Sequence, residues 1–196
     1  MIDHWAAIER KDIIPYYVDE CHVLGDTAVG YGWAPSDHVV AVPVAQPHAR
    51  VSYFGALNMM DGSCVLAAYP TANGDTTVAF LHTLRAKHPK NQLLILWDNA
   101  RYHYKGDVPA FLDDVNMFRN PDEWAVTCKR FAPRDPKQNP IEHVWHIGKQ
   151  SIRRCFRKMN TFDAICKKFE EIRENHYYLS NLRMYIPEYL SNSQSI

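Results

Sequence analysis

The sequence predicts an α/β domain whose core is a mixed β-sheet flanked by helices. Strand-like segments fill the first 70 residues, an apolar run at 93–98 has the pattern of a buried central strand, and two strongly helical segments follow residue 140. Strands joined by a short turn pair antiparallel, whereas strands separated by a helix pair parallel. The sheet should therefore contain both kinds of pairing. At 196 residues, the chain is long enough for one domain with a substantial core.

The first half of the chain supplies three or four strands. These segments are rich in aromatic and β-branched side chains, which favour the pleated conformation. The pair Asp61-Gly62, between the last two of them, is typical of a tight two-residue hairpin turn. The strand candidates are residues 14–23, 28–35, 37–44, 50–60 and 63–70.

The second half of the chain alternates helices with strands. Asn73-Gly74-Asp75 is a helix-start signal, and Pro89 ends that helix before the buried run at 93–98. The crossovers make this half the parallel part of the sheet. The remaining elements are a helix at 107–119, a strand at 124–128, and helices at 140–159 and 161–178.

Composition indicates an intracellular protein without a membrane span. No apolar run approaches the roughly 20 residues that cross a bilayer, and the charged start MIDHWAAIERKD is unlike a secretory signal. The cysteines are odd in number and form no C-x-x-C pair, which favours reduced thiols over a disulfide framework or a zinc knuckle. We therefore expect a cytoplasmic protein. The five cysteines are Cys21, Cys64, Cys128, Cys155 and Cys166.

Charge is unevenly distributed although the formal net charge is zero. Residues 1–128 hold 9 basic and 15 acidic side chains, a net of −6, whereas residues 129–173 hold 12 basic and 5 acidic ones, a net of +7. Such asymmetry fits an acidic metal site beside a surface for a polyanion, although a solvated helical face gives the same pattern.

Three acids stand at the ends of predicted elements. Asp19 follows PYYV, Asp98 follows LLILW, and Glu142 is the third residue of the helix that begins NPIE. Sites in open α/β sheets lie at such strand ends. Carboxylates that converge from separate elements can hold Mg²⁺ ions. Asn99 and His103, in the polar run after Asp98, suit supporting roles beside a ligand.

Glu142 has two competing interpretations besides metal binding. With Asn139 as N-cap and Pro140 at the first helical position, Glu142 would complete a variant of the capping box. His143 and His146, three residues apart on one helix, permit zinc co-ligation, but no third ligand is indicated.

The helix after Pro140 has two distinct stripes. At about 100° per residue, Ile141, Val144, Trp145, Gly148, Ile152, Cys155, Phe156 and Met159 form an apolar stripe that should pack on the sheet. Glu142, His146, Lys149 and Arg153 form a second stripe on its flank. An acid followed by bases is the pattern expected where a metal ligand begins a phosphate-binding ridge.

The sequence resembles the catalytic domain of bacterial insertion-sequence transposases in the mariner-like superfamily, which belong to the D-D-E group with a ribonuclease H-like fold. The resemblance covers about residues 14–180 and is strongest at NPIEHVW. It implies a catalytic domain at 14–180, between an N-terminal extension (1–13) and a C-terminal tail (181–196). The matching stretches are VDE (18–20) with GYGWAP (30–35), LLILWDNARYH (93–103) and NPIEHVW (139–145).

The resemblance assigns metal binding and catalysis to Asp19, Asp98 and Glu142. Its neighbouring motif positions are supporting residues, and they fall on Glu20, Asn99, His103 and Asn139. Two Mg²⁺ or Mn²⁺ ions would serve strand cleavage at transposon ends and strand transfer into target DNA, with a homodimer in the DNA complex near the nucleoid. Our candidates for phosphate contacts are Lys149, Arg153, Arg154, Arg157 and Lys158.

Three departures from the family pattern leave other functions open. FAPRDP replaces the usual Pro-x-Tyr-Ser-Pro segment before the last acid, and the interval from Asp98 to Glu142 is longer than is typical. Family members carry helix-turn-helix domains upstream, but only about a dozen residues precede the first strand here, so that module is either absent or was cut away. A transposase-derived DNA-binding protein without catalysis, or a structure-specific nuclease of the same fold, are the alternatives.

Overall fold

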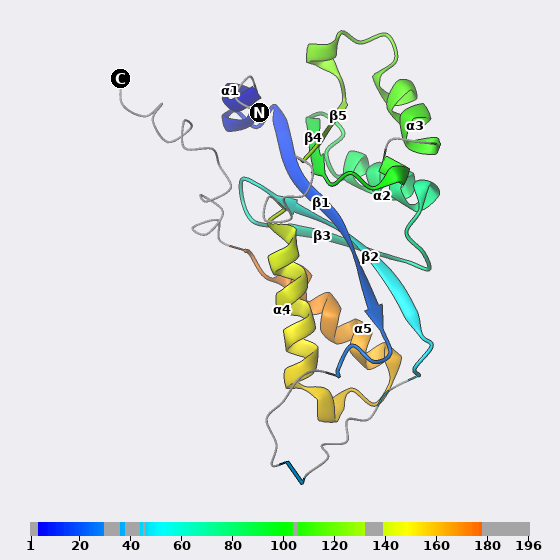
Figure 1. Ribbon diagram of the computed structural model, residues 1–196. Helices are drawn as coiled ribbons and strands as arrows, with labels where there is room; N and C mark the ends of the chain where they lie inside the picture. The colour runs from blue at the N-terminus through cyan, green and yellow to red at the C-terminus, as the bar shows by residue number, and fades with distance from the viewer. Residues whose placement is uncertain are drawn as a thin grey trace.

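The computed structural model describes residues 4–29, 36–37, 44, 46–103, 106–131 and 139–177, and its described elements form three layers (Figure 1). Helices α2 and α3 lie on one face of a central sheet, and α4 and α5 lie on the other. In chain order the elements are α1 (Trp5–Glu9), β1 (Ile13–Leu24), β2 (Arg50–Asn58), β3 (Cys64–Tyr69), α2 (Gly74–Lys87), β4 (Gln92–Trp97), α3 (Asp107–Asn116), β5 (Val126–Arg130), α4 (Ile141–Arg154) and α5 (Phe162–Glu170).

The sheet has five strands in the order β3-β2-β1-β4-β5. β1, β2 and β3 pair antiparallel, whereas β4 pairs parallel with both β1 and β5. The prediction of a mixed sheet is therefore confirmed. The carboxyl end of β4 lies beside the middle of β1, and β1 itself runs on past it to Leu24, paired with β2 (Figure 1).

Alternate residues of β1 face two separate cores. Tyr17 and Cys21 join the core beneath α4 and α5, together with Ile8 of α1. Tyr16 and Val18 join the core beneath α2 and α3. Because successive side chains of a strand point to opposite faces, Asp19 lies on the α4 side and Glu20 on the α2 side.

The predicted helix start at Asn73 is confirmed in detail. The Asn73 side chain accepts a 3.0 Å hydrogen bond from the Thr76 amide, and Thr76 Oγ1 accepts one from the Asn73 amide. This reciprocal cap satisfies two amides that a helix N-terminus leaves without partners.

The predicted two-residue turn between β2 and β3 is wrong. Asn58 and Ser63 still pair, so residues 59–62 form the loop. The Met59 amide donates to the Pro15 carbonyl at 3.0 Å, which draws the chain toward β1 before it can turn. Gly62 then returns the chain with a φ of 70°, a conformation that suits glycine.

The predicted helices after residue 140 are interrupted earlier than expected. α4 ends at Arg154 and a 3₁₀ turn, Phe156–Lys158, follows it, because the Cys155 amide bonds to Ile152 three residues back. α5 likewise gives way to a 3₁₀ turn at Glu171–Glu174. The helix predicted at 107–119 ends at Asn116, and the strand predicted at 124–128 is β5. The strand candidates at 28–35 and 37–44 fall almost wholly outside the described residues.

Candidate active site

The register of the parallel strands brings two of the predicted acids together. β1 and β4 pair up to Tyr17 and Leu96. Continuing each chain by two residues reaches Asp19 and Asp98, so these residues occupy neighbouring positions at the carboxyl end of β4. Asp98 directly follows the last residue of β4, as predicted. The prediction that Asp19 also ends a strand is wrong, because β1 continues to Leu24 through its pairing with β2, and Asp19 pairs with Gly55 inside it.

Asp19 is held from the α4 side of the sheet. Trp145, one turn into α4, donates from Nε1 to Asp19 Oδ2 at 3.0 Å. Burial, followed by the neighbouring charge of Glu20, raises the pKa of Asp19 to about 7, although the Trp145 hydrogen bond opposes that shift. The negative charge of Glu142 adds to the raised pKa.

Glu142 does not cap α4, so the capping-box interpretation is wrong. Pro140 occupies the N-cap position and makes no side-chain cap. Asn139 instead turns its amide into the sheet, where Nδ2 donates to the Val18 carbonyl at 3.4 Å. The Glu142 side chain is exposed and makes no hydrogen bond with any described residue. Its carboxylate is therefore available to a ligand.

Asp98 is held by a charged network from the opposite face. His103 lies 3.1 Å from Asp98 Oδ1 through Nδ1, and 3.2 Å from Glu20 Oε1 through Nε2. Its ring stacks on Trp97 with centroids 4.3 Å apart, and Tyr102 donates to Glu20 Oε2 at 3.1 Å. The His103 side chain is 0% exposed and that of Glu20 is 7% exposed, whereas Asp98 remains 56% exposed.

The network sets opposite pKa shifts on its members. Burial opposes the imidazolium of His103, but hydrogen bonds to Asp98 and Glu20 outweigh it and raise the pKa of His103 to about 9. The hydrogen bond from His103 lowers the pKa of Asp98, and the Ala100 amide, 2.9 Å from Oδ1, contributes. At neutral pH, His103 is therefore a buried cation between two carboxylates.

The other predicted supporting residues, Asn99 and Asn139, lie near the carboxyl end of β4. Asn99 donates from Nδ2 to the Phe131 carbonyl at 3.1 Å, which ties the ends of β4 and β5 together. Asn139 is 7% exposed, and its Oδ1 is buried without a hydrogen-bond partner among the described residues. A buried acceptor without a donor is uncommon, and it lies beside the strand that carries Asp19.

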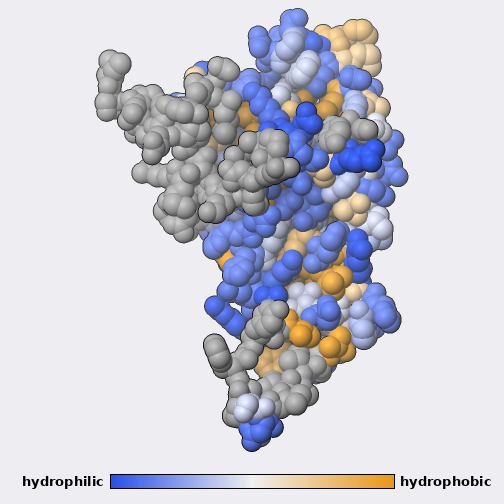
Figure 2. Space-filling model, in the orientation of Figure 1, coloured by the Kyte–Doolittle hydropathy of each residue, from blue (hydrophilic) through white to orange (hydrophobic). Residues whose placement is uncertain are grey.

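The predicted DNA-binding residues lie along and beyond α4. Arg153, Arg154, Arg157 and Lys158 are exposed, and the face that α4 presents in Figure 2 is largely hydrophilic. Lys149 is only partly exposed, and its charge acts on Cys21 and His22 of β1. Lys149 therefore lies in the gap between α4 and the carboxyl half of β1, closer to the acids than the other four.

The donor set suits a hard divalent cation more than zinc. Among the described residues, no three His, Cys, Asp or Glu side chains converge closely enough to hold a metal ion as they lie. His143 and His146 are exposed on α4, and the latter bonds to Gln150 at 2.7 Å. The carboxylates, in contrast, are oxygen donors. Burial first, and then the negative charges of Glu20 and Glu142, raise the pKa of Asp19, and a cation such as Mg²⁺ would relieve that repulsion.

A family profile described as DDE superfamily endonuclease matches residues 15–166, which is more than half of the chain. The chain belongs to this family. All three predicted acids of the DDE domain lie inside the matched segment, as do β2–β5, α4 and all of β1 except its first two residues. A search of curated proteins gave no significant match.

Solved structures show the fold of the DDE domain. A chain of the simian T-cell lymphotropic virus intasome, solved with PP2A regulatory subunit B56 gamma, is similar with a TM-score of 0.53 and 11% identity, over 82% of this chain and 48% of that chain. The Mos1 transposase paired-end complex with the left transposon end gives 0.50 and 12%, over 90% and 60%. The HTLV-2 integrase catalytic core, a dimeric form with magnesium, gives 0.48 and 10%, over 82% and 85%.

The first two likenesses confirm the ribonuclease H-like fold expected from sequence. The DDE domain spans about half of the intasome chain and 60% of the Mos1 chain. Within the described residues, none of the helices has the length and apolarity needed to cross a bilayer.

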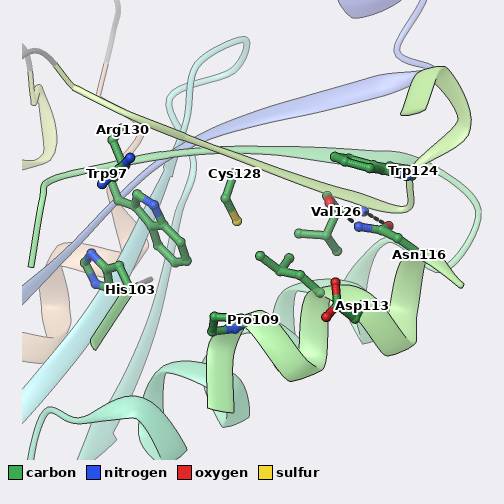
Figure 3. Close-up of a pocket in the computed structure, with 10 residues that line it drawn as sticks. Trp97, His103, Pro109, Asp113, Asn116, Trp124, Val126, Cys128 and Arg130 are labelled. Atoms are coloured by element: carbon green, nitrogen blue, oxygen red, sulfur yellow. Dashed lines mark hydrogen bonds between the residues drawn. The ribbon is translucent and has the colours of Figure 1, made fainter. Parts of the chain in front are cut away.

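A cavity of about 500 Å³ lies behind the Asp98 network, on the α3 side of the sheet (Figure 3). Trp97 and His103 form its wall nearest the acids, and Trp124 and Asn116 lie toward its other end. Asn116 is committed to β5, since it bonds to both backbone groups of Val126. The cavity therefore borders the site through His103 but offers few free polar groups.

Sequence reasoning missed two side chains that hold the acids. Trp145 was assigned to the apolar stripe, yet its Nε1 binds Asp19. Tyr102 was not singled out, yet it binds Glu20. Both are aromatic residues with one polar atom, placed three or four residues from a predicted acid. A buried indole or phenol needs a partner for that atom, and this need was the available signal.

Proposed function

We propose that this DDE domain is the catalytic domain of a DNA transposase of the mariner-like insertion-sequence group. It cleaves DNA strands at transposon ends and joins the freed 3′ ends to target DNA. The observation that carries the proposal is the neighbouring placement of Asp19 and Asp98 beside the carboxyl end of β4, with the negative charge of Glu142 contributing to the raised pKa of Asp19. A buried carboxylate with a strongly raised pKa, beside two others, is typical of a functional site.

Asp19, Asp98 and Glu142 would together hold two Mg²⁺ or Mn²⁺ ions. When bound, such ions activate the attacking water or 3′-hydroxyl and stabilise the leaving oxygen. His103, which Glu20 holds from its other ring nitrogen, orients Asp98 and keeps it anionic at neutral pH. Asn99 and Asn139 fix the backbone around the acids, through Phe131 and Val18 respectively.

The DNA backbone would lie along α4, beside the acids. Lys149, nearest the acids, and the exposed Arg153, Arg154, Arg157 and Lys158 would neutralise successive phosphates, so binding should weaken as salt concentration rises. In the complex we expect a homodimer, in which each copy would act on one transposon end. We also expect the protein to work in the cytoplasm, at the nucleoid.

The test is metal-dependent nicking of supercoiled plasmid by Asp98→Asn, which keeps the shape of the side chain and removes its charge. We expect loss of nicking with Mg²⁺ or Mn²⁺, with a cooperative unfolding transition retained. Asp114→Asn, an exposed acid on α3, is the matched control and should nick as wild type does. Full activity of Asp98→Asn would sink the assignment of the acids.

Strand transfer is tested separately, with a short duplex carrying a free 3′-hydroxyl as donor and plasmid as target. Joined products that depend on Asp98 support the transposase. Nicking without joined products would favour a structure-specific nuclease. DNA binding without either reaction, and no response to Mn²⁺, would favour a binding protein that has lost catalysis.

A further inference from the structure

Trp145 occupies an unusual place for a core tryptophan. Its side chain is buried, with 4% of the residue exposed, and its ring stacks on Phe169 with centroids 5.9 Å apart and an interplanar angle of 19°. Its polar atom nevertheless reaches the predicted metal ligand, since Nε1 lies 3.0 Å from Asp19 Oδ2. The same indole therefore belongs to the core and to the site.

Gly55 creates the space that the indole fills. Gly55 of β2 is the direct cross-strand partner of Asp19 on β1, so both residues face the α4 side of the sheet. A Cβ at Gly55 would lie 2.2 Å from Trp145 Cη2, 2.7 Å from Cζ2 and 2.9 Å from Ile141 Cδ1. Glycine weakens a strand interior and often marks a close approach. Here the indole ring comes close because no side chain stands at Gly55.

α4 thereby connects two of the proposed ligands. Glu142 and Trp145 are three residues apart, on adjacent turns of one rigid helix. Glu142 projects from that helix itself, whereas Asp19 on β1 is bound to it through the indole. One element therefore sets the relative position of both carboxylates.

We propose that Trp145 is a positioning residue, whose indole N–H fixes the Asp19 carboxylate relative to Glu142. The absence of a side chain at Gly55 leaves the space that the indole ring needs. The identity of the cation rests on the proposed function, but the hydrogen bond and the close packing do not. Groups that orient metal ligands commonly change metal affinity by about 10–100-fold when removed. A tryptophan that served only the core would change stability and leave metal affinity alone.

The first experiment measures Mn²⁺ affinity by calorimetry for Trp145→Phe, which keeps an aromatic ring in the core and removes the N–H. We expect affinity to fall by about 10–100-fold. Phe169→Leu is the matched control, because Phe169 packs on the Trp145 ring without touching Asp19. It should lose stability and keep Mn²⁺ affinity. Equal affinity in Trp145→Phe and wild type, or an equal loss in Phe169→Leu, would overturn the proposal.

The second experiment is a double-mutant cycle between Gly55→Ala and Trp145→Phe. Gly55→Ala alone should weaken Mn²⁺ binding and lower stability, because its Cβ displaces the outer edge of the indole. A phenyl ring does not extend to the Cη2 position, so the added methyl should harm Trp145→Phe much less than it harms wild type. Strict additivity would mean that Gly55 and Trp145 act independently, against the proposal.

A third measurement needs no metal. Hydrogen exchange of the Trp145 indole N–H, followed by NMR in the metal-free protein, should be slow in wild type and faster in Asp19→Ala. Unchanged exchange would remove the hydrogen bond on which the proposal stands. If exchange behaves as expected but wild type binds no Mn²⁺, the proposed function fails, and Trp145 orients Asp19 for a purpose other than metal binding.

Discussion

Asp19 and Asp98 are neighbours beside the carboxyl end of β4, yet they are held in opposite ways. Asp19 receives a neutral indole N–H from Trp145, and its pKa is raised to about 7 by burial first. Asp98 is half-exposed, contacts the buried cation His103, and has a lowered pKa. On the α4 side of the site, the position of Asp19 therefore depends mainly on the packing of Trp145. On the α2 side, the position of Asp98 depends mainly on the charge of His103.

This difference shows how one site can contain carboxylates of unequal charge. Asp98 is ionised throughout the neutral range, whereas Asp19 takes up a proton near neutrality unless another positive charge is present. Substitutions should also affect the two carboxylates differently. Disturbed packing displaces Asp19, but loss of the imidazolium leaves Glu20 buried without a cationic partner.

His103→Ala should produce the largest loss of stability. The substitution leaves the Glu20 carboxylate, 7% exposed, without its cationic partner, and breaking a buried pair in this way typically costs about 3–5 kcal/mol. Chemical denaturation at pH 7 measures the effect. His143→Ala, at an exposed position on α4, should change stability by less than about 0.5 kcal/mol. A loss no greater than that of His143→Ala would show that charge does not hold the α2 side.

The two sides should lose stability in different pH windows in metal-free protein. The folded-state pKa of Asp19, about 7, lies above its ordinary value of 3.8, so the folded protein binds that proton more tightly and stability falls as pH rises from about 4 to 7. His103, raised from 6.5 to about 9, stabilises fully below pH 6.5, and this contribution is lost as pH rises through 9.

Each window should disappear with its own residue. Asp19→Asn should abolish the lower decline, and His103→Gln the upper one, each on the order of 2 kcal/mol because a pKa unit corresponds to about 1.4 kcal/mol and water screens part of it. Denaturation curves from pH 4 to 9.5, in a buffer with chelator, measure both. An upper decline that persists in His103→Gln would assign that titration to another group.

Sequence patterns predicted what local periodicity determines. The apolar run of β4 ends at Asp98, as its pattern predicted. Asp19 ends only the apolar part of β1, because the strand continues to Leu24 through its pairing with β2, a long-range contact that the local pattern does not contain. The amphipathic stripe of α4 likewise predicted which face would be buried, as Ile141, Val144 and Ile152 confirm.

The remaining features depend on contacts between distant segments. Glu20 and His103 are 83 residues apart, and Trp145 and Asp19 are 126 apart, so no local pattern pairs them. The four-residue loop after β2 arises from a bond to Pro15, which no turn signal contains. Asn139 and Glu142 have the spacing of a cap in sequence, but Asn139 Nδ2 donates to the distant Val18 carbonyl, and Asn139 Oδ1 accepts no hydrogen bond from the described amides of α4.

Gly148→Ala tests the packing side without touching either acid. A Cβ there would lie 2.8 Å from Phe169 Cε2 and 3.1 Å from Ile172 Cγ2. Overpacking costs about 1–3 kcal/mol and improved helix propensity returns up to about 1 kcal/mol, so we expect a net loss on the order of 1 kcal/mol. Thermal or chemical denaturation measures it, with Gln150→Ala on the same helix as a near-neutral control. A gain in stability would show that α4 and α5 can move apart far enough to accommodate the added methyl group without cost.

Tyr102→Phe should have the smallest effect, although it removes a donor to a carboxylate just as Trp145→Phe does. Glu20 loses the 3.1 Å bond from Tyr102 and keeps His103, so stability should fall by about 1 kcal/mol or less. Among the described side chains, in contrast, Asp19 accepts a hydrogen bond only from Trp145. Mn²⁺ affinity should therefore stay within about twofold of wild type in Tyr102→Phe, whereas Trp145→Phe should lose about 10–100-fold. Similar losses of affinity in the two variants would mean that the number of remaining donors does not decide how well each acid is held.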